Sequence, residues 1–207
     1  FLLFFHIILK GFSVTLSLIF AIGAQNAFVL KQGLRKEHVL PIILICIFID
    51  VILIGTGVFG IGYLVSQNPF IIKIIAVIGM VFLCGYALIC LRSAFKNEHM
   101  QLEKGKKKKS LKEVITLVLV FSLLNPHTYL DTILLIGGIG ASYIELQEKL
   151  YFLSGSIMAS FIWFISLGYG SRILIPLFQK NITWKILDIF IAILLFSIAY
   201  SLLELLN

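Results

Sequence analysis

Charged residues are scarce in this sequence of 207 residues: Asp, Glu, Lys and Arg make up 13% of it, against about 25% in ordinary soluble domains. So few charges cannot cover the surface of a soluble fold, and the mean hydropathy is +1.07. Apolar runs of roughly 18 or more residues recur along the chain, and each is long enough to cross a bilayer as a helix. The sequence therefore predicts an all-α, polytopic membrane protein.

Motifs for catalysis, metal binding and nucleic-acid recognition are missing as well. The cysteines Cys46, Cys84 and Cys90 lie in apolar segments without C-x-x-C spacing, which favours small buried hydrophobic residues. No H-E-x-x-H motif, serine nucleophile elbow or Cys/His metal spacing occurs. The basic residues are not interleaved with aromatic residues, as nucleic-acid binding would require. We therefore expect no enzyme activity, cofactor, metal site or nucleic-acid partner.

Six apolar segments emerge between polar breaks, with the approximate ranges 7–30, 40–65, 70–92, 112–142, 149–177 and 184–206. At about 1.5 Å per residue, each can cross a hydrocarbon core of about 30 Å. A basic loop at 96–111 separates three segments from three more. Because three is odd, the halves 1–95 and 112–207 would have opposite orientations. We predict one transmembrane domain of two inverted three-helix repeats, with interrupted helices 1 and 4.

Basic residues accumulate on one side of the predicted segments. If the segments alternate, one side keeps only Lys10, Lys73 and Lys149, and the rest of the 17 Lys and Arg, Lys31 among them, lie on the other. The positive-inside rule then places both termini outside the cytoplasm. The run Lys106–Lys109 in the cytoplasmic loop would contact anionic lipid. Small-residue pairs allow close helix packing and leave a homodimer open.

Two carboxylates lie inside apolar segments: Asp50 in ICIFIDVILIG, and Asp131 at the end of LLNPHTYLD (123–131). A charged side chain at the bilayer centre costs about 2.5–3.5 kcal/mol on insertion scales, so such residues usually mark a substrate or proton pathway. The alternative for each is an interior carboxylate that forms a helix–helix hydrogen bond.

Two segments also carry signals of a helix break. Pro126 cannot donate to the helix ladder and its ring clashes with the preceding turn, and Asn125 before it resembles an N-cap. The range 112–142 would then be two half-helices that meet near Asn125. In the first half, GAQN supplies Gln25 and Asn26 in a similar position. Such paired breaks point to a transporter's binding site, although a proline kink and polar packing contacts would leave the same signature.

These polar residues suit an amino acid as ligand. The N-terminus of a half-helix can accept a carboxylate, and amide side chains can add neutral hydrogen bonds. Asp50 and Asp131 would hold a cationic group, because no basic residue accompanies them between the interfaces. Asp50, Asp131 or His127 could exchange a proton, although His127 could equally be a plain hydrogen-bonding residue.

Two long stretches resemble a known family. IGAQNAFVLKQGLRKEHVLPIILICIFIDVILIGTGVFGIG (22–62) resembles the first half of the LysE family of bacterial lysine and arginine exporters, and LLNPHTYLDTILLIGG (123–138) resembles the start of its second half. The blocks Q-N-A-F-V-x-x-Q-G-x-R and N-P-x-x-Y-L-D carry the resemblance, which covers essentially the whole chain. The family motifs fall on Gln25, Asn26, Asp50, Asn125, Pro126 and Asp131. Family members often have Pro where this chain has Ala24, so the break signal is weaker in the first segment.

The resemblance implies export of lysine and arginine across the bacterial inner membrane, driven by the proton-motive force. We hypothesise that the half-helix at Asn125 and Pro126, with the amides of Gln25 and Asn26, holds the substrate carboxylate. The two acids would hold its cationic groups, and one would exchange a proton in antiport. Three other functions stay open: an exporter of neutral amino acids, a divalent-cation efflux protein that uses the two acids with His127, and a scaffold without transport activity.

Overall fold

The computed structural model describes residues 2–20, 23–60, 69–95 and 110–204, and these residues are helical without any β-strand. In chain order the elements are α1 (Leu2–Ile19), α2 (Ala24–Arg35), α3 (Val39–Val58), α5 (Pro69–Phe95), α6 (Leu111–Leu123), α7 (Pro126–Tyr129), the π-helix η2 (Leu130–Ile136), α8 (Gly137–Ala141), α9 (Leu146–Gly170), the 3-10 helix η3 (Ser171–Gln179) and α10 (Asn181–Glu204). The all-helical prediction is confirmed for this part of the chain. The run Lys106–Lys109 lies outside it.

Four helical stretches among the described residues are long and apolar enough to cross a membrane: Val39–Val58, Val77–Phe95, Leu146–Leu177 and Ile182–Leu203. A fifth span results if α1 and α2, which bend by 82° at their junction, cross together. The stretch from α6 to α8 consists of shorter helices. The structure therefore supports a polytopic protein with four to five candidate spans, while the arrangement of six helices in two inverted repeats stays a prediction.

Both predicted helix breaks are present. α1 ends at Ile19 and α2 begins at Ala24, after Gly23 in an extended conformation. α6 ends at Leu123 and α7 begins at Pro126, where proline is tolerated because the first turn of a helix has no intrahelical partner for its N–H groups. The helix break in the first segment is therefore present, although its signal in the sequence is weaker.

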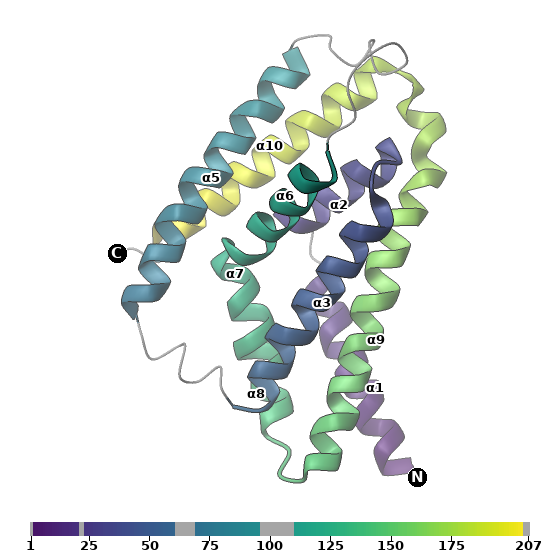
Figure 1. The fold of residues 1–207 in the computed structure, drawn as a ribbon, viewed down its shortest axis with the longest axis vertical. Coiled ribbons are helices and arrows are strands. Elements are labelled where there is room, and N and C mark those ends of the chain that lie inside the picture. Colours follow the sequence, from purple (N-terminus) through teal and green to yellow (C-terminus); the bar gives the residue numbers. More distant parts are fainter. Residues whose placement is uncertain (1, 21–22, 61–68, 96–109, 205–207) are drawn as a thin grey trace.

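The helices of the two predicted halves pack mainly against each other. α1 lies along α9, and α5 lies along α10 (Figure 1). α3 contacts α9, η2 and α8. Each of these contacts joins a helix from before the basic loop to one from after it. The interior of the molecule is therefore built jointly by both halves.

In two of these contacts, glycines allow the backbones of the two helices to touch directly. A Cβ atom on Gly155 of α9 would overlap the Ile8 carbonyl of α1, and one on Gly11 would overlap the Phe152 carbonyl. Close packing of this kind is what small residues in apolar helices allow. In the other contact, between α3 and the second half of the broken helix, a Cβ atom on Gly57 would lie 2.5 Å from the Ile133 oxygen.

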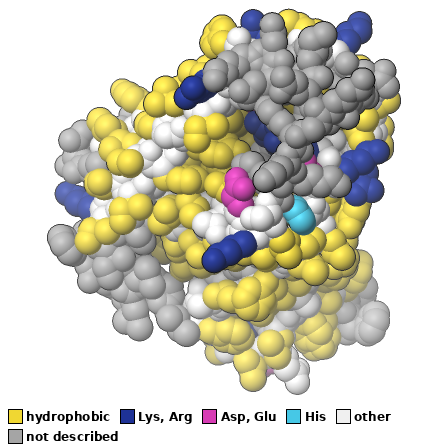
Figure 2. Space-filling model, turned by 45° about the horizontal axis from the view of Figure 1, so that its top comes forward, with side chains coloured by type: hydrophobic (Ala, Val, Ile, Leu, Met, Phe, Trp, Pro, Cys, Tyr) yellow, Lys and Arg dark blue, Asp and Glu magenta, His cyan; other side chains and the backbone are white. Residues whose placement is uncertain are grey.

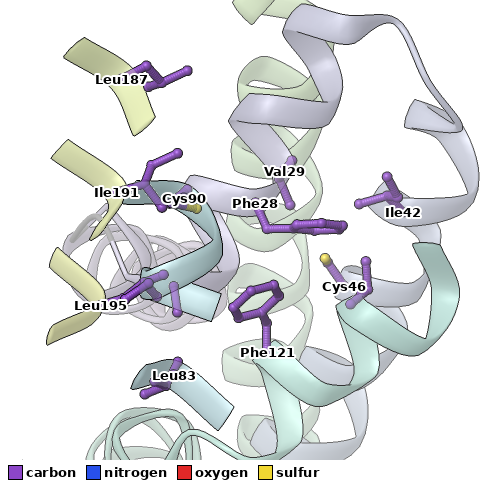
Figure 3. Close-up of a cluster of buried hydrophobic side chains, with 14 of the residues drawn as sticks. Phe28, Val29, Ile42, Cys46, Leu83, Cys90, Phe121, Leu187, Ile191 and Leu195 are labelled. Carbon is purple, nitrogen blue, oxygen red and sulfur yellow. The ribbon is translucent and has the colours of Figure 1, made fainter. Parts of the chain in front are cut away.

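A large apolar cluster fills the space between α2, α3, α5, α6 and α10. Phe28 and Phe121 lie at its centre with ring centroids 5.2 Å apart (Figure 3). Cys46 and Cys90 are buried in this cluster and carry free thiols, as predicted, whereas Cys84 is half-buried. The close aromatic packing leaves this part of the interior dense.

Basic residues gather where α2 and α5 end and where α6 and α10 begin, toward the top of Figure 1. Figure 2 brings this end forward and shows Lys and Arg side chains spread across it. We call it the basic end, and its described members are Arg35, Lys36, Arg92, Lys112, Arg172, Lys180 and Lys185. Lys31, predicted on the same side, is not among the exposed members, because its side chain is buried and pairs with buried Asp188 of α10.

Candidate binding site

A cavity of about 250 Å³ lies where the two helix breaks meet. Its lining contains the predicted site residues Gln25, Asn26, Asp50, Asn125 and Asp131. The fold thus brings together side chains from α2, α3 and both sides of the second break. Pro126 and His127 belong to α7 by their backbone, and their side chains lie outside the described part of the structure.

Asp50 enters the cavity from the middle of α3. Its side chain is 3% exposed, and the hydroxyl of Ser160 on α9 donates a hydrogen bond of 2.7 Å to its Oδ2 atom. This is the helix–helix bond that we considered as the alternative to a functional role. Because Asp50 also lines the cavity, the bond orients a carboxylate that remains next to space for a ligand.

Asp131 lies in the first turn of the π-helix η2. A π-helix is rare and appears mostly as a single turn inside an α-helix, frequently at a functional site. In this turn the Thr132 hydroxyl donates a hydrogen bond of 2.5 Å to the Thr128 carbonyl, a type of bond that often bends a helix. Thr128, Asp131 and Thr132 all line the cavity. The irregular turn therefore presents several polar side chains to the same space.

Asn26 holds the first break together. Its Nδ2 atom donates a hydrogen bond of 2.7 Å to the Ile19 carbonyl at the end of α1, and Trp163 of α9 donates to its Oδ1 atom at 3.3 Å. The last carbonyls of a helix have no partner within that helix, so this bond satisfies one of them inside the protein. Both polar atoms of the Asn26 amide are thus engaged, which favours a positioning role.

Gln25 is better placed than Asn26 to bind a ligand. It lines the cavity, and its Nε2 atom is buried without a hydrogen-bond partner among the described residues. The Cys46 thiol, a weak hydrogen-bonding group, lies beside it. A buried donor left unsatisfied costs about 1–3 kcal/mol. A ligand oxygen in the cavity would remove this cost.

The second break has an internal bond of the same kind as the first. The Tyr129 hydroxyl donates a hydrogen bond of 2.5 Å to the Leu123 carbonyl, at the end of α6. Asn125 lies in the break and lines the cavity. Beyond it the helical backbone continues without interruption from Pro126 to Ala141. Pro126 has no N–H group and the Thr128 N–H donates to the Asn125 carbonyl at 3.0 Å, so the first turn contributes mainly the positive end of the helix dipole to the cavity.

The described lining of the cavity is acidic. Asp50 and Asp131 supply two carboxyl groups, and no Lys, Arg or His belongs to the lining as far as the structure describes it. The cavity can therefore hold a cationic group at its acids and a carboxylate at the helix N-terminus.

Several residues around the cavity were not predicted. Ser160 and Trp163 of α9 hold Asp50 and Asn26 in place. A signal existed for Ser160, since Ser156 and Ser160 lie one turn apart in an apolar helix and a polar pair of this spacing marks one inward face. The partners of these residues lie more than 100 positions away in the chain.

Comparisons with known proteins identify relatives of this chain. Residues 16–205 match the family model described as LysE type translocator. YggA of Aeromonas salmonicida, named as an amino-acid transporter, is 35% identical over 94% of each chain. The arginine exporter protein ArgO of Salmonella enteritidis is 32% identical over 93% of this chain and 91% of its own. A protein of Mycobacterium bovis, also named as an amino-acid transporter, is 38% identical over 86% of this chain and 88% of its own.

No solved structure matches this chain. The family model covers most of the sequence, including both helix breaks and every residue of the candidate site. The chain therefore belongs to the LysE family of translocators.

Proposed function

We propose that this protein is a secondary transporter that exports basic amino acids, L-arginine and L-lysine, from the cytoplasm. The observation that carries the proposal is the pair of carboxylates, Asp50 and Asp131, in one cavity whose described lining has no basic residue. Acids buried in a membrane protein are costly unless a cation or a proton accompanies them. The similarity to a protein named arginine exporter supports the same substrate class.

The size and polarity of the cavity suit a single amino acid. Its volume of about 250 Å³ is just below the range of about 300–1,000 Å³ that is typical of drug-sized ligands. In our proposal the α-carboxylate meets the first turn of the helix that begins at Pro126 and the free Nε2 group of Gln25. The ammonium or guanidinium group of the side chain lies between Asp50 and Asp131.

Export against a gradient needs an energy source, and we propose proton antiport. Asp50 and Asp131 are ionisable groups at the binding site, so one of them can take up a proton as the cationic substrate leaves. His127 is a further candidate from its place in α7. The positive-inside rule assigns the basic end to the cytoplasm, which places both termini outside. A bacterial inner membrane supplies the required proton gradient.

Efflux from cells preloaded with arginine- or lysine-containing dipeptides tests this proposal. Wild-type protein should speed the loss of both amino acids, and Asp50→Asn or Asp131→Asn should reduce that rate by about tenfold or more, since each loses a charge-assisted contact worth about 1.5–3 kcal/mol. Glu145→Gln is the matched control, because it removes the same charge from an exposed position at the start of α9. Full export by the Asp50→Asn/Asp131→Asn double variant would refute the binding role of the acids.

The same assay separates the alternative functions. Export restricted to neutral amino acids would change the substrate class, and stimulation by a divalent metal would point to cation efflux. Among the described residues no group of three His, Cys, Asp or Glu side chains could hold a metal ion. If the efflux of every tested solute were the same with and without the protein, the remaining function would be that of a scaffold without transport activity.

A further inference from the structure

A second buried charge cluster lies apart from the cavity. The Lys31 Nζ atom of α2 lies 2.5 Å from the Asp188 Oδ1 atom of α10, with the two side chains 8% and 0% exposed. Burying such a pair costs desolvation energy that its attraction repays only in part, so an ion pair of this kind is weak evidence for stability. A role in switching between two states is a better-supported use of such a pair.

The position of the pair follows from two helices. On α2, Asn26 lines the cavity and Lys31 lies five residues further on, about 7.5 Å along the axis. On α10, Ile198 lines the cavity and Asp188 precedes it by ten residues, about 15 Å along the axis. Both directions lead to the basic end, where α2 ends and α10 begins. The ion pair therefore lies between the cavity and the basic end.

Aromatic side chains close the space between the pair and the cavity. Phe28, Tyr86 and Phe121, which we call the aromatic cluster, pack with ring centroids 4.8 Å apart for Tyr86–Phe121 and 5.2 Å for Phe28–Phe121. Figure 3 shows Phe28 and Phe121. Together with Lys31 they surround a narrow gap that has no room for a water molecule. The gap borders the cavity, since Ala24 lines both.

We propose that the Lys31–Asp188 pair and the aromatic cluster form a gate that closes the cavity from the basic end, and that substrate enters when the pair separates. This inference rests on the proposed function for its direction, from the cytoplasm to the cavity. In the closed state the two charges neutralise each other without water. In the open state each charge is hydrated, which offsets the lost attraction and keeps the two states close in free energy.

The gate predicts opposite effects for two kinds of substitution. Asp188→Asn leaves the Lys31 ammonium buried without its counter-charge, which disfavours the closed state. The double substitution Lys31→Met/Asp188→Leu removes both charges and fills the space with apolar groups, which favours the closed state because opening no longer gains hydration. A pair that served only to hold α2 to α10 would predict that the double variant transports normally.

A cysteine in the cavity reports the state of the gate without any substrate. Gly23→Cys is suitable because Gly23 lines the cavity and a Cβ atom there meets nothing within 4 Å. The three native cysteines would be replaced by alanine. Inside-out membrane vesicles expose the cytoplasmic face to a membrane-impermeant maleimide, and the rate of labelling is measured together with arginine export and membrane abundance.

With Asp188→Asn we expect labelling about tenfold faster or more than in the otherwise identical reference, since an uncompensated buried charge strongly destabilises the closed state. With the double variant we expect labelling no faster than the reference and export reduced by about tenfold or more. Lys31→Met provides the same test with the opposite residual charge if Asp188→Asn does not accumulate. Unchanged labelling in the single variants, or export at the normal rate by the double variant, would overturn the gate. Failure of arginine export in the wild type would reject the proposed substrate and leave the labelling result valid.

Discussion

Replacing Gly57 by alanine tests whether close packing between α3 and the second broken helix sets the geometry of the binding site. Gly57 lies two turns after Asp50 on α3, and it faces Gly137, which directly follows the π-helix that carries Asp131. A Cβ atom on Gly57 would lie 2.5 Å from the Ile133 oxygen, whereas ordinary contact begins at 3.4 Å. The difference of 3.4 − 2.5 = 0.9 Å must be absorbed by moving the two helices apart.

Overpacking of this size costs about 1–3 kcal/mol of stability. It should also displace Asp131 from Asp50 by on the order of 1 Å, and a misplacement of that size can cost about a hundredfold in a site that depends on orientation. We expect Gly57→Ala to reduce arginine export at least about tenfold at equal membrane abundance, and to lower the thermal midpoint of the purified protein.

Gly55→Ala is the matched control on the same helix. A Cβ atom there meets nothing within 4 Å, and alanine is favoured over glycine in a helix by about 1 kcal/mol. This variant should export normally. Equal export by Gly57→Ala and Gly55→Ala would refute the inference that this backbone contact positions the two acids.

Two further substitutions test the bonds around the cavity. Ser160→Ala removes the donor to Asp50 and should lower export about tenfold, since hydrogen bonds to charged groups contribute about 1.5–3 kcal/mol. The control is Ser156→Ala, whose hydroxyl donates only to backbone carbonyls, that of Phe152 one turn earlier and that of Gly11 on α1. It should export within about twofold of wild type, and equal losses in the two variants would assign the effect to helix packing. Tyr129→Phe removes the bond to the Leu123 carbonyl and should cost about 0.5–1.5 kcal/mol of stability, measured by thermal unfolding in detergent. An unchanged midpoint would show that water satisfies that carbonyl.

The sequence was most informative where a single residue forces the backbone. Pro126 cannot continue a helix, so the break after Leu123 could be predicted without any neighbour. Asp50 and Asp131 stood out because a charge in an apolar segment is costly, and the fold brings both to one cavity. Asp188 also lies in an apolar run, so the same argument would have marked it. In the sequence its partner Lys31 is only a topology signal, and the pairing of the two depends on how α2 packs against α10.

Other features depend on tertiary structure and could not be predicted. The π-helix η2 adds one residue to a turn, and no local pattern distinguishes LDTILLI from an ordinary helix. The role of Ser160 depends on where α9 lies relative to α3, which periodicity does not specify. The sequence of an apolar helix can show which of its faces points inward, but not which other helix packs against that face.

The pairing of α1 with α9 and of α5 with α10 has a consequence for synthesis. A nascent chain inserts its helices in order, so α1 must wait in the lipid until α9 has been made, and α5 must wait for α10. Until then Gly11 and the other small residues on α1 face lipid or the insertion machinery. The helices that precede the basic loop are therefore unable to complete their own packing, and synthesis that stopped in this loop would leave a product whose helices lack their partners.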